Sequence, residues 1–300
     1  MIEKRIITSE YDGLELEAEF MLPKVKPVGI FQISHGMTEH KERYEELMDH
    51  LCNRGYICVI HDHRGHGQSV SSDEDLGYFY TEDIWAIVGD LHQISSLSKS
   101  LYPELPLYLF GHSMGSLVAR CYLKRYDSEL AKLILCGPPT RNPVLPLAIG
   151  LTKLSQLIHG PKYRNRLINH LAFSLYNKPY DTPNSWLSAN EDNVKAYNDD
   201  PFCGFTFTNN GFLNLFYLLR EAYSKNGWCL SSPKLPILLM AGADDPVIQD
   251  KKHFDELASF LHGIGYGDIS SKLYNGMRHE ILNEHGKQEV YEDILNFLEN

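Results

Sequence analysis

Several features that mark specialised proteins are missing from this 300-residue chain. Basic residues are outnumbered, since 28 Lys and Arg stand against 39 Asp and Glu and give a formal net charge of -11. Nucleic acids and anionic membranes are polyanions that would repel such a chain at long range, so neither is expected as a principal partner. No uninterrupted apolar run is long enough to cross a bilayer, and no apolar signal segment precedes the first strand-like pattern. We therefore expect a cytoplasmic protein.

Disulfide, metal and cofactor motifs are also absent. The six cysteines lack the spacing of a disulfide framework and fall mostly in apolar runs, so we expect reduced core residues; they are Cys52, Cys58, Cys121, Cys136, Cys203 and Cys229. The histidines of residues 35–40 and 61–66 fit no zinc signature, and we expect their ring nitrogens to bond backbone groups instead. Neither a dinucleotide nor a nucleoside triphosphate motif occurs. The chemistry is expected to need no metal and no cofactor.

The hydrophobic pattern predicts an α/β fold with a mostly parallel central sheet. Strand-like runs alternate with helical patterns, which is typical of parallel strands with helices on both faces. The expected strands are residues 28–33, 56–61, 107–110, 133–136, 236–240 and 271–274, and the expected helices are residues 40–54, 81–97, 116–126, 251–261 and 288–298. The first residues, 2–9 and 14–21, are expected to form an antiparallel edge hairpin around Asp12-Gly13.

The alternation breaks between about residues 137 and 233, where helical patterns follow one another. We expect a core of residues 1–136 and 234–300 and a helical lid insertion of residues 137–233, lying over the carboxyl ends of the strands. Its first helix carries an apolar stripe at helical spacing, made of Leu147, Leu151, Leu154 and Ile158. A second stripe covers residues 212–223. Most of these side chains should pack the lid on the core, and the remainder should line an apolar tunnel or mouth.

One motif carries the strongest chemical signal. Gly111-His112-Ser113-Met114-Gly115 stands between a strand-like run and a helical pattern, which is the context of a nucleophile elbow. The glycines relieve the crowding of a sharp strand-to-helix crossing, and Ser113 would be exposed on a strained turn. The alternative is a serine in an ordinary tight turn. The flanking strand and helix favour the nucleophile.

A serine hydroxyl is a weak nucleophile and needs a base and an orienting acid, in the order serine, acid, histidine. Asp245 follows an expected strand, and Pro246 fixes it at the loop apex, so we prefer it to Asp244. One of these two aspartates is expected to cap the helix that follows. His279 lies in a loop beside Gly276 and is the candidate base, whereas His285 is expected to be a solvated surface residue.

The same reaction needs two backbone donors for a developing oxyanion. One comes from the head of the helix after Ser113 and the other from the loop after an early strand. We assign them to the backbone N–H groups of Met114 and Met37.

Together these motifs resemble the α/β-hydrolase superfamily, and within it the monoacylglycerol lipase and lysophospholipase group, which shares a sequence family with serine aminopeptidases. The likeness also covers the Asp-His-Arg-Gly-His-Gly-x-Ser stretch of residues 62–69 and runs from about Gly29 to the final helix. It implies Ser113 as nucleophile, Asp245 as acid and His279 as base, with Met37 and Met114 as oxyanion donors. Two departures from the family pattern are Thr38, where a small residue is common, and Ala189, where an arginine is expected.

The expected activity is hydrolysis of a monoacylglycerol, a lysophospholipid or a related ester through an acyl-enzyme. The partners are then a small-molecule ester or lipid, and the lid could contact lipid surfaces transiently. A serine aminopeptidase is the first alternative, but nothing in the sequence places acidic lid residues in the pocket to hold a substrate ammonium; these residues are Glu191, Asp192, Asp199 and Asp200. A receptor for a hydrophobic ligand is the second, because fold alone does not determine function.

Overall fold

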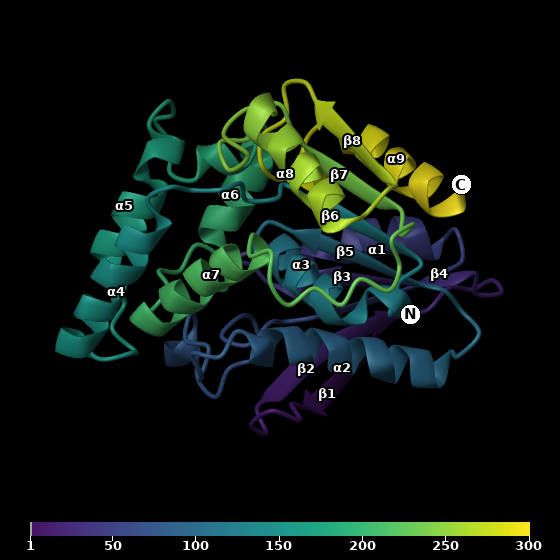
Figure 1. Cartoon of the computed structure of the whole chain (residues 1–300), viewed down its shortest axis with the longest axis horizontal. Helices are drawn as coiled ribbons and strands as arrows, with labels where there is room; N and C mark the ends of the chain where they lie inside the picture. Colours follow the sequence, from purple (N-terminus) through teal and green to yellow (C-terminus); the bar gives the residue numbers. More distant parts are fainter. Residues whose placement is uncertain (1) are drawn as a thin grey trace.

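The computed structural model describes residues 2–300 and contains one eight-stranded sheet in the order β1-β2-β4-β3-β5-β6-β7-β8 (Figure 1). The strands are β1 (Ile2–Thr8), β2 (Glu15–Met21), β3 (Gly29–Ser34), β4 (Tyr56–His61), β5 (Leu107–His112), β6 (Lys132–Cys136), β7 (Ile237–Gly242) and β8 (Ile269–Tyr274). β2 pairs antiparallel with both β1 and β4, and all other pairs are parallel. The expected hairpin and the mostly parallel α/β sheet are therefore confirmed.

Helices cover both faces of the sheet (Figure 1). Helices α2 (Trp85–Leu101), α3 (Met114–Tyr126) and α8 (Lys251–Ile264) contribute to the larger apolar core on one face. Helices α1 (Glu45–Cys52) and α9 (Lys287–Glu299) contribute to a second core on the other face. The central strands β3, β4 and β7 are buried along their whole length, as expected for strands covered on both sides.

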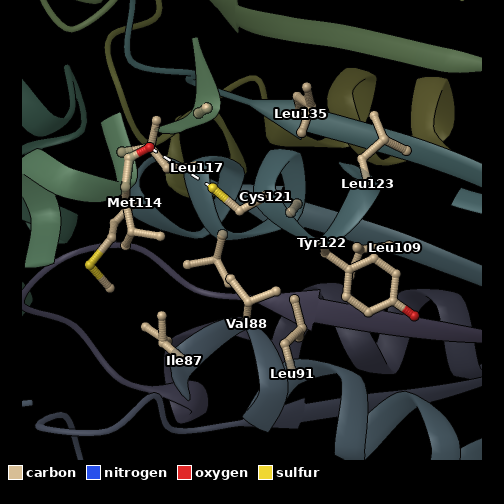
Figure 2. Packing of buried hydrophobic residues seen from close by; sticks show 14 of the residues in the cluster. Ile87, Val88, Leu91, Leu109, Met114, Leu117, Cys121, Tyr122, Leu123 and Leu135 are labelled. Atoms are coloured by element: carbon tan, nitrogen blue, oxygen red, sulfur yellow. Dashed lines mark hydrogen bonds between the residues drawn. The ribbon is translucent and has the colours of Figure 1, made fainter. Parts of the chain in front are cut away.

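The larger core fixes the helix that follows β5. Leu117 and Cys121 of α3 belong to this core together with residues of α2, among them Val88 and Leu91 (Figure 2). All four side chains are at most 1% exposed. Burial of a leucine-sized side chain stabilises the fold by about 1.5–3 kcal/mol. This packing holds the beginning of α3 in a fixed position beside the sheet.

The strand order creates a meeting point for two loops. From β3 the chain crosses to β4 on one side, and β5 then pairs with β3 on the other side. The loops that follow β3 and β5 therefore leave neighbouring strands at the same carboxyl edge, which is where ligands bind in open parallel sheets.

Between β6 and β7 lie four helices, α4 (Leu145–His159), α5 (Arg166–Asn177), α6 (Glu191–Asp199) and α7 (Asn209–Ala222). In Figure 1, α4 and α5 form the part of this segment farthest from β8 and α9. Helix α7 differs from them, because Phe212, Leu213 and Leu218 are fully buried in the larger core. The segment is thus tied to the core through α7, whereas α4 and α5 bury few of their residues.

Three expectations need correction. Neither Asp244 nor Asp245 caps α8; the cap is Asp250, whose extended backbone lets its carboxylate accept the His253 N–H. Cys229 is exposed, although the other five free cysteines are buried. The stripe of α4 is not packed on the core, since its four members are 40–65% exposed.

Candidate active site

The residues around Ser113 form a strained turn. Ser113 has φ 51° and ψ -117°, between the last residue of β5 and the first residue of α3. A Cβ atom at Gly111 would lie 2.6 Å from the Gly115 carbonyl oxygen, and one at Gly115 would collide with the backbone of Ser34. Only glycine fits at both positions, so the sequence around Ser113 permits an unfavourable backbone conformation at this serine.

The predicted acid and base are in contact. The Nδ1–H of His279 donates to Asp245 Oδ2 at 2.8 Å, and both side chains are at most 3% exposed. Asp245 Oδ1 accepts the Val247 N–H at 2.8 Å, which fixes the carboxylate in its loop. Asp244, the rejected alternative, is exposed, and so is His285.

Ser113 and His279 line the same cavity, together with Met37 and Met114. Within residues 2–300 no hydrogen bond joins the Ser113 hydroxyl to the His279 imidazole in this conformation. Catalytic hydrogen bonds are often long before substrate binds. Met114 is the first residue of α3, so its N–H is among the free donors of the helix N-terminus. The site roles of these residues stay predictions.

A buried polar cluster lies behind the turn. Glu39 Oε1 accepts the Gly36 N–H at 2.5 Å and the Tyr44 hydroxyl at 2.8 Å, and lies 3.1 Å from His112 Nδ1. Burial alone would raise the pKa of Glu39, but the hydrogen bond and charge of His112 hold it well below its usual range. Burial would lower the pKa of His112, and Glu39 raises it instead. The cluster fixes the loop after β3 against the residue that precedes Ser113.

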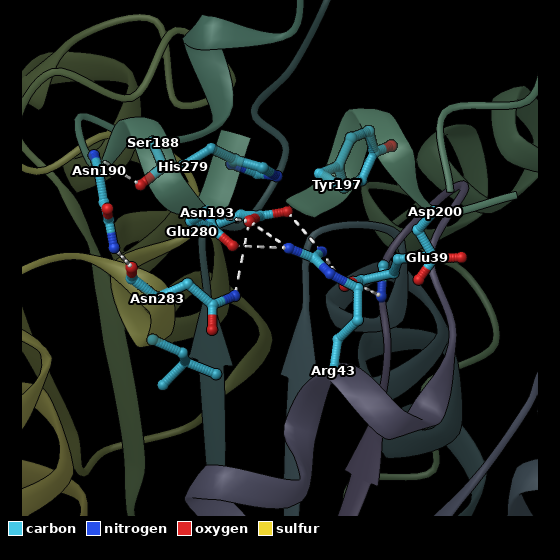
Figure 3. Close-up of polar contacts among 12 residues, drawn as sticks. Glu39, Arg43, Ser188, Asn190, Asn193, Tyr197, Asp200, His279, Glu280 and Asn283 are labelled. Atoms are coloured by element: carbon cyan, nitrogen blue, oxygen red, sulfur yellow. Dashed lines mark hydrogen bonds and ion pairs between the residues drawn. The ribbon is translucent and has the colours of Figure 1, made fainter. Parts of the chain in front are cut away.

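Arg43 joins this cluster to the loop that carries His279 (Figure 3). Its guanidinium donates to Glu39 Oε2 at 2.9 Å and to both Glu280 oxygens at 2.7 Å. Burial would raise the pKa of Glu280, but the charge of Arg43 lowers it. Arg43 also bonds Asn193 of α6 and lies 4.9 Å from the ring centroid of Tyr197. One cation thus connects three segments around the candidate site.

Thr38 connects the same loop to α6. Its hydroxyl lies 2.8 Å from the Tyr197 hydroxyl, which also donates to the Thr38 carbonyl at 2.9 Å. Thr38 has φ 53°, so the turn after Met37 is a left-handed one. The departure from the family pattern at Thr38 therefore provides a tie between the loop after β3 and the helical segment.

The cavity in front of Ser113 has a volume of about 570 Å³. Its walls are mostly apolar side chains of α3, α4, α5 and α7, and they include Leu117, Leu147, Leu151, Ile168, Leu171, Phe173, Leu175, Leu215, Phe216 and Leu219. Leu147 and Leu175 are 64% and 71% exposed, so the cavity is open along α4 and α5. Of the predicted apolar stripe, Leu147 and Leu151 line the cavity, whereas Leu154 and Ile158 do not.

Four histidines form a buried group near this edge of the sheet. The ring centroid of His35 lies 4.5 Å from that of His63 and 5.2 Å from that of His66, and His61 lies 4.8 Å from His63. His35 and His66 each bond a backbone carbonyl, as expected. His61 is an exception, because neither of its ring nitrogens has a partner among the described residues. Burial lowers the pKa of His61 to about 3.

Two groups of potential metal ligands are already engaged by protein groups. His40 lies 2.6 Å from Glu42 and 2.8 Å from Asp200, with Cys203 nearby. The second group contains three carboxylates, and the Lys41 ammonium lies 2.9 Å from Glu17 and 2.8 Å from Glu42 within it. A buried lysine thus supplies the cation that these carboxylates need.

Sequence reasoning missed Arg43, Glu280 and Trp186 as members of the site. Glu280 stands directly after the candidate base, and Trp186 lies with its ring centroid 5.3 Å from that of His279. The signal for Glu280 was an acidic residue beside the histidine. No local signal identifies Trp186, because its partner is more than ninety residues away.

The parallel sheet with a serine turn after β5, an aspartate after β7 and a histidine after β8 defines the α/β-hydrolase class. The chain belongs to the family described as "Serine aminopeptidase, S33", whose model matches residues 25–286. It is 30% identical to the monoglyceride lipase of Homo sapiens over 277 residues, covering 91% of this chain and 82% of that protein.

Two further comparisons agree. The chain is 25% identical to a monoacylglycerol lipase of Mycolicibacterium smegmatis over 292 residues, which cover 95% of this chain and 93% of the relative. It also resembles the crystal structure of a carboxyl esterase from Bacillus coagulans in complex with glycerol. That likeness has a TM-score of 0.87 at 27% identity and covers 99% of this chain and 98% of the other.

Proposed function

We propose that this protein hydrolyses monoacylglycerols through an acyl-enzyme formed on Ser113. The broader class, a serine hydrolase of carboxylic esters, is that of the relatives and the esterase structure to which the chain is similar. One observation carries the finer proposal: Ser113 and His279 lie in the wall of an apolar cavity whose lining contains no lysine and no arginine among the described residues. Such a site suits an acyl chain with an uncharged head group.

The proposed mechanism follows from the positions of the side chains. Ser113 attacks the ester carbonyl while His279 takes the hydroxyl proton, and Asp245 holds the imidazole and stabilises its charged form. The N–H groups of Met37 and Met114 stabilise the tetrahedral oxyanion. His279 then gives its proton to the departing alcohol. Water, deprotonated by His279, attacks the acyl-enzyme and releases the acid.

The charges at the cavity distinguish head groups. Glu39 and Glu280 are the acidic residues of its lining, and Arg43 neutralises both from outside the cavity. A phosphate-bearing head group would find no cation to replace its lost hydration, and burying an unpaired charge is costly. A monoacylglycerol avoids that cost, which favours it over a lysophospholipid.

The aminopeptidase alternative has less support. The four acidic residues of the insertion that were candidates for holding a substrate ammonium do not line the cavity. They are Glu191, Asp192, Asp199 and Asp200. The two carboxylates that do line it are already paired with Arg43. An ammonium would have to compete with this buried guanidinium.

We further propose that the 137–233 insertion acts as a lid whose outer surface contacts lipid. Leu157 and Leu167 are 84% and 67% exposed and do not line the cavity, and further leucines of α4 and α5 are exposed beside them. Exposed apolar surface of this kind marks an interaction site. In the described chain, residues 2–300, no helix combines the length and the apolar character needed to span a membrane.

A substrate panel tests the activity. Nitrophenyl esters of increasing chain length, monoacylglycerols, lysophospholipids and aminoacyl amides are assayed side by side. Each buried methylene contributes up to about 0.8 kcal/mol, so kcat/KM should rise severalfold per added carbon until the cavity is filled. Monoacylglycerols should exceed lysophospholipids of the same acyl chain. A preference for acetate esters would contradict the acyl site, and efficient cleavage of the amides would establish the peptidase.

Vesicle co-sedimentation tests the lipid contact. The protein should sediment with zwitterionic phosphatidylcholine vesicles and less with anionic ones, because its net charge is -11. Replacing Leu157 and Leu167 by serine should weaken sedimentation. Hydrolysis of a short, water-soluble ester shows whether the variant is folded. Equal sedimentation of variant and wild type would refute the role of this surface.

A further inference from the structure

A short segment of the insertion, Ser185 to Asn193, lies along the loop that carries His279. We call this segment the strap and residues 277–284 the histidine loop. The Glu280 N–H donates to the Leu187 carbonyl at 2.7 Å, and the Asn190 side-chain amide donates to the Asn283 carbonyl at 2.9 Å. Figure 3 shows Ser188, Asn190 and Asn193 of the strap beside Glu280 and Asn283. Two backbone groups of the histidine loop, the Glu280 N–H and the Asn283 carbonyl, are thus bonded by the strap.

Glu284 anchors this contact from the loop side. Its carboxylate accepts the backbone N–H groups of Ala189 at 2.8 Å and Asn190 at 3.1 Å in the strap. It also accepts the N–H of Arg278, directly before His279, at 2.9 Å. Glu284 is only 2% exposed. One buried carboxylate therefore connects the strap with the residue that precedes the candidate base, through strong charge-assisted hydrogen bonds.

Arg278 and Trp186 complete the contact on either side of His279. The Arg278 guanidinium donates to the carbonyls of Ser185 at 2.6 Å and Ser188 at 2.9 Å. Trp186 lies against the His279 ring at a centroid distance of 5.3 Å. Asp245 holds the His279 ring through Nδ1. Trp186 of the strap lies against a face of the same ring and so limits its rotation.

Helices α4 and α5 belong to the same insertion but differ in this respect. In the part of the chain that the structure describes, no hydrogen bond joins residues 145–177 to the histidine loop. These helices expose their leucines, whereas Leu187 of the strap is 4% exposed. The insertion therefore contains an exposed apolar part, α4 and α5, and a strap that is hydrogen-bonded to the histidine loop and has Leu187 and Ser188 buried.

We propose that the strap, anchored by Glu284 and Arg278, positions His279 for catalysis. This inference rests on the proposed hydrolase function. It makes Glu284 and Arg278 positioning residues, which act on the reaction only through His279. Displacement of a catalytic group by about 1 Å can lower a rate by about 100-fold.

The test compares Glu284→Gln with Glu191→Gln. Both remove one carboxylate, but Glu191 is exposed on α6, at the end of the strap, and its side chain has no hydrogen-bond partner among the described residues. Glu284→Gln places an amide group where a carboxylate accepts three N–H donors. We expect kcat for a nitrophenyl ester to fall by about 10- to 100-fold with KM changed less than twofold. Glu191→Gln should match wild type.

A spectroscopic measurement separates positioning from a general loss of structure. The proton between His279 Nδ1 and Asp245 should give a downfield proton NMR signal, which Asp245→Asn removes and so assigns. In Glu284→Gln this signal should shift or broaden while the thermal unfolding transition is kept. An unchanged signal with kcat equal to that of Glu191→Gln would overturn the proposal.

A second pair of variants covers the case in which Glu284→Gln does not fold. Arg278→Ala removes the bonds to Ser185 and Ser188, and Arg278→Lys retains a cation that can reach one carbonyl. We expect a loss of kcat in Arg278→Ala and partial recovery in Arg278→Lys. Equal kcat in both and in wild type would contradict the strap. An inactive, folded wild type that a fluorophosphonate does not label would instead refute the hydrolase function itself.

Discussion

Replacing His61 by leucine should make the protein less sensitive to acid. His61 is fully buried, and both ring nitrogens lack a partner among the described residues. Burial lowers its pKa from 6.5 to about 3. The unfolded chain therefore binds a proton between these values that the folded chain does not, and the free energy of unfolding falls as the pH falls below 6.5. His61→Leu removes this effect.

The magnitude follows from proton linkage. One such histidine lowers the free energy of unfolding by about 1.4 kcal/mol per pH unit below its unfolded pKa. Going from about pH 7.5 to about pH 5.5, His61→Leu should gain about 1.4 kcal/mol relative to wild type. At neutral pH the change should be neutral or stabilising, because an apolar side chain replaces a buried polar group without partners.

Urea unfolding at several pH values measures this gain. Wild type should show a steep dependence, because burial also lowers the pKa of His35 to about 4 and of His66 to about 3. His285→Leu, at an exposed position, is the control and should keep the wild-type pH dependence. Parallel curves for His61→Leu and wild type would refute the reasoning.

Two further predictions concern the site. Asp245→Asn should lower kcat for ester hydrolysis by about 10⁴-fold, as for acid replacement in another triad. Asp244→Asn changes an exposed residue without contact to His279 and should lower kcat far less. The reverse ranking of the two variants would overturn the assignment. Arg43→Met should lower the free energy of unfolding by about 3–5 kcal/mol, since Glu39 and Glu280 would remain buried without their common cation. Denaturant unfolding measures this loss, and a loss below about 1 kcal/mol would contradict the ion-pair role.

The sheet and the turn at Ser113 could be predicted because their signals are local. Apolar runs bounded by turn residues locate β3 to β8, and two glycines within five residues identify the strained turn. The order of serine, acid and histidine pointed to the loops after β7 and β8, and Pro246 and Gly276 within them favoured Asp245 and His279, which the structure joins at 2.8 Å. Both inferences need only the residues themselves and the chain order.

The connections around the site could not be predicted. Arg43 bonds Glu280 across 237 positions, and Glu284 bonds Ala189 across 95. Hydrophobic periodicity predicts helices and strands, but it does not predict which buried charged residues form ion pairs after folding. The α8 cap was a different error, because Asp250 stands directly before the first helical residue, and the rule for helix starts would have selected it over Asp244 and Asp245.

The central claim is that Ser113 is an activated nucleophile. The most direct measurement is labelling with a fluorophosphonate probe, followed by identification of the modified residue by mass spectrometry. The proposed mechanism predicts stoichiometric modification of wild type at Ser113 and none of folded Ser113→Ala, with ester hydrolysis lost in parallel. Folded wild type that stays unlabelled, or label at another residue with full activity in Ser113→Ala, would contradict it.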